Sequence, residues 1–285
     1  MAGTCCGEAP CRQLPIACLS VVEVRRIMAR MPSRVQWSPV ELLVAFRLYC
    51  RMPFGRLHQR NPEIVELSSR LGRTPSAVAM KACNFASLDP AQRARNIKAL
   101  ENASQADRRL WERFQRNPEE VASEAEAAYA EVTGRDAPRL ETELEPPEGP
   151  SEILRMVRTR RVQAFFRDAV LISYDNRCAL SEIAVPGLLN ASHIIPWKVE
   201  VERRADPRNG IALNVLYDRA FDRGLITFDA SLRVVLSRQL LKAAAPPPLH
   251  RHALLELEGR KLRLPKRFAP DPEAMAYHRE HVFSD

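Results

Sequence analysis

The residue types best suited to chemistry lie between positions 193 and 222. His193 follows a mostly apolar run, Asn209 comes sixteen residues later, and Asp218 and Asp222 are four residues apart. On a helix, a spacing of four places two carboxylates on one face, within reach of a single cation. A neutral imidazole can accept a proton near pH 7, and Mg²⁺ or Mn²⁺ prefers carboxylate oxygens. A base and a metal-binding carboxylate pair are parts that metal-assisted hydrolysis needs.

The residues around this set form an ordered motif. The chain has HIIPW beginning at His193, NG at Asn209 and FDRG beginning at Phe221. This order resembles the ββα-metal active site of the HNH endonucleases, in the branch that is grouped with restriction endonucleases. The resemblance covers roughly residues 160–240.

The resemblance implies a role for each polar residue of the motif. His193 would be the general base, and Asn209 would brace the loop that aims its ring. Asp218 and Asp222 would bind a divalent metal ion, with Mg²⁺ or Mn²⁺ favoured over Zn²⁺ or Ni²⁺. Two positions depart from the family pattern, because Ser192 stands where many members have Asp or His, and Asp218 replaces the last histidine. An alternative for Asp218 is an ion pair with a neighbouring arginine.

Basic residues indicate a polyanionic partner. The formal net charge is +8, and the regions on both sides of an acidic stretch near residues 134–150 are basic. DNA is the expected partner, although an arginine-rich composition can also come from a GC-rich genome. Guanidinium groups match phosphate geometry, so the arginines of the motif are candidates for phosphate contacts. They are Arg203, Arg204, Arg208, Arg219 and Arg223.

The N-terminal region is predicted to be mainly helical. Several prolines follow Ser, Thr, Asn or Asp, which is typical of the first turn of a helix. Helices are expected near 39–52, 62–71, 75–87, 90–101, 105–115 and 118–133.

Residues 62–85 of this region resemble a helix-turn-helix of the Myb-like kind. In that arrangement Arg73, Lys81 and Asn84 would face outward and contact DNA. The alternative is a three-helix bundle that docks on the nuclease region without touching DNA.

These patterns predict an α+β chain in four parts. They are a flexible extension at 1–35, a helical DNA-binding domain at 36–133, an acidic proline-rich linker at 134–150 and an HNH nuclease domain at 151–285. Within the last part we expect a helix at 151–174, a strand at 188–195, a helix at 213–223, a hairpin of 225–228 with 232–236, and a helix at 272–283.

Cysteine content and hydropathy indicate the cellular compartment of the protein. The seven cysteines form no CxxC pair, which suits a reducing cytoplasm better than a disulfide framework. No apolar run approaches the roughly 20 residues of a membrane span. The remaining histidines are expected to be surface or packing residues; they are His58, His250, His252, His278 and His281.

The sequence favours a metal-dependent DNA endonuclease of restriction or defence type. The resemblance implies that each active site cuts one strand, so double-strand cleavage would need a homodimer or two binding events. Two alternatives remain open. One is a decayed HNH scaffold that only binds DNA, and the other is a structure-specific or RNA-directed nuclease.

Overall fold

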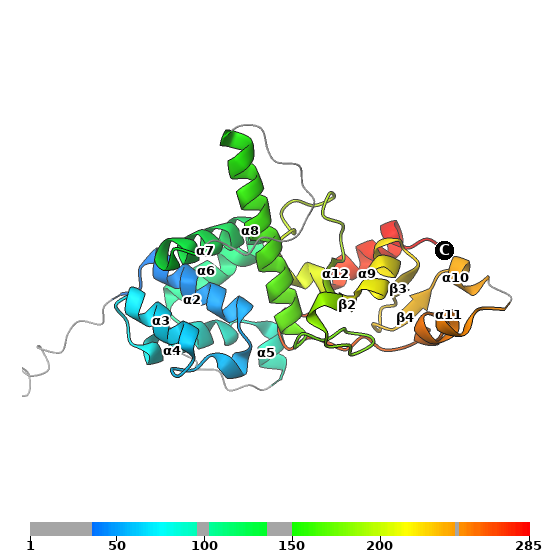
Figure 1. Cartoon of the computed structure of the whole chain (residues 1–285), viewed down its shortest axis with the longest axis horizontal. Coiled ribbons are helices and arrows are strands. Elements are labelled where there is room, and N and C mark those ends of the chain that lie inside the picture. Colours follow the sequence, from blue (N-terminus) through cyan, green and yellow to red (C-terminus); the bar gives the residue numbers. More distant parts are fainter. Residues whose placement is uncertain (1–35, 96–102, 136–149, 243–244) are drawn as a thin grey trace, which may run out of the picture. The chain divides into compact units, whose positions relative to one another are not determined.

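The computed structural model describes residues 36–95, 103–135, 150–242 and 245–285, and Figure 1 draws the rest as a grey trace. The predicted extension at 1–35 and nearly all of the predicted linker lie outside the described residues. The described chain is α+β, as predicted, with helices in its N-terminal part and two small sheets in its C-terminal part. None of the described helices is both long enough and apolar enough to span a membrane.

Capped helix starts define the N-terminal region. Ser38 forms a capping box with Glu41, and Asn61, Thr74 and Asp89 each accept a hydrogen bond from the first turn of the helix that follows. Five of the predicted helices are confirmed within about two residues. The sixth, expected at 90–101, is described only as far as its first turns. The helices are α2 (Pro39–Arg51), α3 (Pro62–Arg70), α4 (Pro75–Ala86), α5 (Pro90–Ala94), α6 (Gln105–Arg116) and α7 (Pro118–Thr133).

The predicted outward positions of Lys81 and Asn84 are wrong. These side chains are only 7% and 8% exposed, because α6 and its neighbours cover that face of α4. Lys81 Nζ lies 3.0 Å from Oδ1 of the fully buried Asp107. Arg73 donates two hydrogen bonds to the Glu41 carboxylate. Arg73 and Lys81, two of the three residues expected to contact DNA, thus form ion pairs within the helical region.

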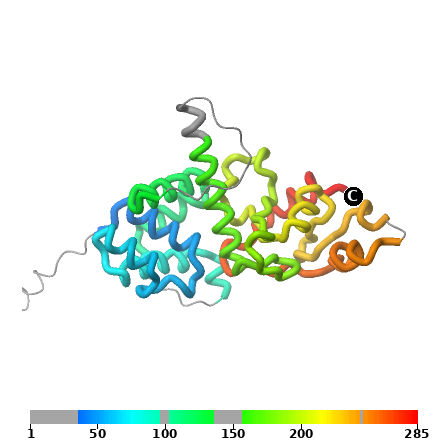
Figure 2. Tube along the Cα trace, viewed as in Figure 1, coloured from blue at the N-terminus to red at the C-terminus, as the bar shows by residue number. Residues whose placement is uncertain are grey.

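A long helix leads into the strands of the second region. Helix α8 (Pro150–Ser173) agrees with the predicted helix, and β1 (Leu189–His193) pairs antiparallel with β2 (Gly210–Asn214). Helix α9 (Val215–Asp222) follows β2 directly, and it contacts both strands. The Cα trace can be followed through these elements in Figure 2.

The resemblance to a ββα unit implies a second strand, but the range of β2 was not predicted, because Asn209 and Gly210 were expected in a turn and the helix was expected to begin at 213. All five residues of β2 are buried, so it lacks the polar–apolar alternation that marks a half-buried strand. The expected helix at 213–223 therefore begins two residues later, where Asn214 caps the amides of Leu216 and Tyr217.

A second small sheet and short helices complete the fold. The predicted hairpin is confirmed as β3 (Ile226–Phe228) paired with β4 (Val234–Leu236). The expected last helix is α-helical only in its first half, since residues 278–282 form a π-helical turn. The short helices are α10 (Arg238–Leu241), α11 (Pro248–Ala253), η4 (Leu255–Leu257), α12 (Pro272–Tyr277) and η5 (His278–Val282).

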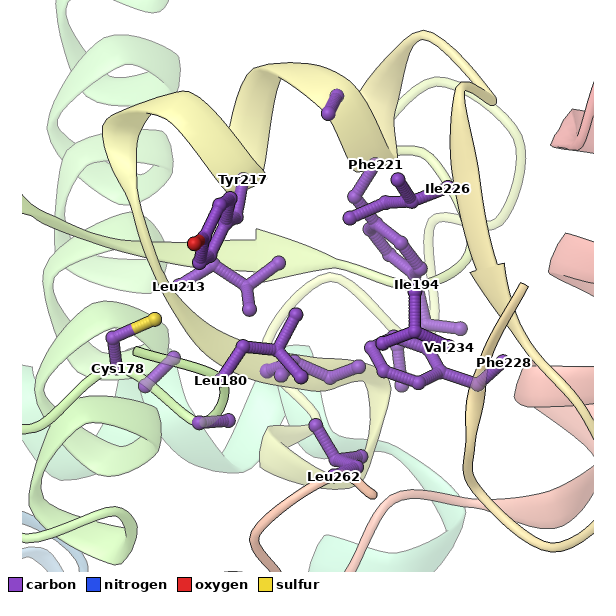
Figure 3. Close-up of a cluster of buried hydrophobic side chains, with 14 of the residues drawn as sticks. Cys178, Leu180, Ile194, Leu213, Tyr217, Phe221, Ile226, Phe228, Val234 and Leu262 are labelled. Atoms are coloured by element: carbon purple, nitrogen blue, oxygen red, sulfur yellow. The ribbon is translucent and has the colours of Figure 1, made fainter. Parts of the chain in front are cut away.

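One apolar core holds β1, β2, α9 and the second sheet together. Figure 3 shows Leu213, Phe221 and Ile226 pointing into a shared cluster with Phe228 and Val234. Gly224, which follows α9, has a positive φ of 66°, and an added Cβ would lie 2.1 Å from the Val282 carbonyl oxygen. The end of α9 therefore packs closely against the C-terminal segment, and α9 also contacts β1.

Candidate active site

His193 ends strand β1, and its ring has a defined tautomer. Its Nε2 lies 3.1 Å from the carbonyl oxygen of Arg204. A carbonyl oxygen can only accept, so Nε2 must carry the hydrogen and donate it. The other ring nitrogen, Nδ1, is then left as the acceptor. A neutral imidazole in this tautomer can remove a proton from water.

Two aromatic rings enclose His193. The Phe166 ring of α8 stacks on it, with centroids 3.8 Å apart and an 11° angle between the planes, and Trp197 lies edge-on at 5.4 Å. Burial lowers the pKa of His193 to about 4, although the hydrogen bond to Arg204 and the charge of Asp218 act in the opposite direction. The ring is therefore neutral at physiological pH.

The Asn209 side chain joins the two backbone segments that hold the histidine. Its Oδ1 accepts from the Ile195 amide at 2.8 Å, and its Nδ2 donates to the carbonyls of Ile195 at 3.2 Å and Arg203 at 3.5 Å. Ile195 follows His193 by two residues, and Arg203 precedes the Arg204 carbonyl that accepts from the ring. Asn209 is only 1% exposed. Asn209 therefore links the backbone on both sides of the contact between His193 and Arg204.

Asp218 lies on α9 beside strand β1. Its carboxylate accepts hydrogen bonds from Ser192 Oγ at 2.5 Å and from Asn190 Nδ2 at 2.6 Å. Among the described residues, no arginine lies within ion-pair distance of Asp218, so the alternative of a simple ion pair does not describe it. Ser192, at the position before His193, thus contacts Asp218, which lies where the motif usually has its last histidine. Asn190 was not singled out from the sequence.

Asp222 lies one turn further along α9. Partial desolvation and the nearby charge of Asp218 raise its pKa to about 6, and the positive charges of Arg219 and Arg223 reduce that shift. The two carboxylates therefore repel each other. A bound cation would relieve this repulsion.

The donors present suit some metals better than others. Among the described residues, no three His, Cys, Asp or Glu side chains are grouped so that they could hold a metal ion together. Zinc sites usually need three or four such ligands. Mg²⁺ commonly uses one or two carboxylates together with waters and substrate phosphate. Asp218 and Asp222 fit this second kind of site.

The predicted phosphate-binding arginines fall into two groups. Arg203 pairs with Asp271 at 2.8 Å, Arg208 pairs with Asp206 at 2.8 Å, and Arg204 donates to the Trp197 carbonyl while its guanidinium lies over the Trp197 ring. These three arginines help to hold the loop between the strands.

The second group consists of Arg219 and Arg223. Both are exposed on α9, on the helix that carries the carboxylates. No carboxylate of the described residues lies within ion-pair distance of either side chain. Of the five predicted arginines, these two are the exposed ones, and the other three are partly buried.

Comparison with protein families gives one match. Residues 178–229 match the model of the HNH endonuclease family, and this span contains β1, β2, α9 and the four residues predicted to be catalytic or to bind the metal. A comparison with curated proteins found no match. Phe166 lies before the matched residues.

Proposed function

We propose that this chain, which contains an HNH endonuclease domain at residues 178–229, is a metal-dependent endonuclease that hydrolyses phosphodiester bonds of DNA. One observation carries the proposal. His193 is partly buried, neutral and held in the tautomer that leaves Nδ1 as an acceptor, and Asp218 is near enough for its charge to raise the pKa of the ring. A base beside a carboxylate pair is the arrangement that metal-assisted hydrolysis needs.

Each residue has a distinct task in this reaction. His193 Nδ1 accepts a proton from the attacking water, and the Arg204 carbonyl keeps the ring oriented. Asn209 holds the segments on both sides of that contact. Asp218 and Asp222 would hold a divalent ion, which supplies stabilisation of negative charge on the scissile phosphate and the leaving oxygen.

We place the DNA backbone on α9, where Arg219 and Arg223 are exposed. Phosphate contacts fix the position of a protein on a duplex, whereas base contacts give sequence specificity. With Lys81 and Asn84 buried, the described recognition-helix candidate offers little for reading bases. We therefore propose that α9 supplies the main backbone contacts at the cleavage site. The restriction or defence role, with one strand cut per active site, is proposed from the resemblance to the HNH motif.

Nicking of supercoiled plasmid tests the function. Purified protein is assayed with EDTA, Mg²⁺, Mn²⁺, Ni²⁺ or Zn²⁺, beside His193→Ala and Asp222→Ala. His58→Ala is the matched control, because that histidine is exposed and lies in the helical region. We expect nicking with Mg²⁺ or Mn²⁺ that is lost in the two site variants and kept in the control.

Other outcomes of the same assay have definite meanings. Protein that shifts DNA but cuts none with any metal is a decayed scaffold that binds DNA, and the proposal is then wrong. Stronger cleavage of branched DNA or RNA than of duplex DNA would assign a structure-specific or RNA-directed nuclease. If duplexes are cut in both strands, sedimentation analysis of the active protein shows whether a homodimer supplies the second site.

A further inference from the structure

We infer that Phe166 is a positioning residue for His193, so that helix α8 completes the active site from outside the span matched by the family model. The inference rests on the proposed function of His193 as the base. Three observations carry it, and each concerns a different part of the structure.

The first observation is the stacking of the two rings. The Phe166 and His193 ring centroids are 3.8 Å apart and the planes differ by 11°, which is closer and more parallel than the edge contact of Trp197. The bond from Nε2 to the Arg204 carbonyl holds one atom of the imidazole. The Phe166 face adds the restraint on the plane of the ring. Together they determine where Nδ1 points.

The second observation is the residue opposite His193 in the sheet. His193 pairs with Gly210 across β1 and β2. An added Cβ at Gly210 would lie 2.8 Å from Phe166 Cζ and 2.5 Å from Val170 Cγ2. Real Cβ atoms do not approach so closely. The absence of a side chain at Gly210 thus provides the space that Phe166 occupies.

The third observation is the anchoring of α8. Phe165, the preceding residue, packs in the aromatic core of the helical region, with ring centroids 6.0 Å from Phe114 and 6.4 Å from Phe46. Asp168 forms an ion pair with Arg51 of α2. Adjacent phenylalanines of one helix therefore enter two cores, Phe165 that of the helical region and Phe166 that of the strands, where it stacks on His193.

Phe165 also provides a matched control. We compare Phe166→Leu with Phe165→Leu, two neighbouring buried rings replaced by the same side chain. Both variants should lose stability in thermal unfolding. Only Phe166→Leu should slow single-turnover nicking, by about tenfold to a hundredfold at saturating protein and metal, because misplacement of a base lowers the rate of the chemical step. DNA affinity measured in EDTA should be unchanged in both.

A second measurement does not depend on cleavage. Nitrogen NMR of the imidazole distinguishes the two neutral tautomers of a histidine. We expect a single Nε2–H form of His193 in the wild type and in Phe165→Leu, and a mixture of forms in Phe166→Leu. Phe166→Met serves if Phe166→Leu does not fold, because methionine fills irregular gaps.

The outcomes separate the two proposals. Equal nicking rates in Phe165→Leu and Phe166→Leu, with one unchanged tautomer in both, would overturn the positioning role. A wild type that cuts nothing while Phe166→Leu alone mixes the tautomers would remove the proposed function and keep the structural role of Phe166.

Discussion

His193 and Asp222 have pKa values that desolvation moves in opposite directions, to about 4 and about 6. A base with a low pKa stays deprotonated as the pH falls through 6, whereas a carboxyl group with a raised pKa takes up a proton there. As the pH falls, the proposed metal site should therefore be lost before the proposed base becomes protonated. We predict that the acid limb of nicking has its midpoint near pH 6 at low metal concentration.

Competition between protons and metal checks this assignment. A tenfold rise in Mg²⁺ should move the midpoint down by about one pH unit while Asp222 is the limiting group. The shift should stop near pH 4, where His193 itself becomes protonated. If the midpoint of the acid limb lies near pH 6.5 and does not change with the metal concentration, His193 titrates like an exposed histidine, contrary to its burial.

The exposed arginines of α9 should contribute more to DNA binding than the arginines that form ion pairs within the protein. We predict that Arg223→Ala weakens DNA binding and lowers the slope of log affinity against log salt by about one, as expected for one lost phosphate contact. Arg203→Ala should leave the slope nearly unchanged and reduce thermal stability, because Arg203 pairs with Asp271. DNA titrations at several salt concentrations measure the slopes. Equal slopes for Arg223→Ala and wild type would contradict the proposed contact of α9 with the DNA backbone.

The candidate site was predictable where its parts are close in sequence. His193, Asn209 and Asp218 come from one strand–loop–strand–helix unit, so the resemblance of that unit to the HNH motif was enough to group them. Asn190 could have been found by alternation, since it lies two residues before Ser192 on the same face of β1. Phe166 could not, because its contact with His193 depends on how α8 packs against the strands.

At the scale of elements, the close contact of α8 with β2 depends on Gly210. We predict that Gly210→Ala destabilises the protein by about 1–3 kcal/mol, since the new methyl group must displace Phe166 or Val170. Gly187→Ala is the control, because nothing lies within 4 Å of an added Cβ there. Chemical denaturation compares the two. A Gly210→Ala protein as stable as the control would mean that α8 can move away without cost.

Helix starts were easier to predict than strands or exposed faces. A proline after a capping side chain fixes a start by local chemistry, and this signal succeeded at α2, α3 and α4. A fully buried strand such as β2 gives no alternating pattern. The buried face of α4 could not be predicted from its own sequence either, because Lys81 is buried beside another helix and pairs there with Asp107.

At the scale of the whole molecule, Arg267 joins segments that are far apart in sequence. Its guanidinium donates to the carbonyls of Tyr49 and Met52, at the end of α2, and lies 4.6 Å from the Tyr49 ring centroid. The next residue, Phe268, donates its amide to the buried Asp89. Residues from Ser38 to Asp285 form one compact unit. The helical and nuclease regions should therefore unfold together.

Replacement of Arg267 tests this coupling. Arg267→Met keeps an apolar stem but leaves two carbonyls without their donor, which should cost about 2–4 kcal/mol because the side chain is only 2% exposed. Lys266→Met is the control, since Lys266 is half exposed and its ion pair with Asp175 should contribute at most about 1 kcal/mol. Calorimetry should show one transition for the wild type, lowered by roughly 5–15 °C in Arg267→Met and little changed in Lys266→Met. Two separate transitions in the wild type would mean that the contacts of Arg267 do not couple the regions, and that 36–133 and 151–285 behave as independent domains.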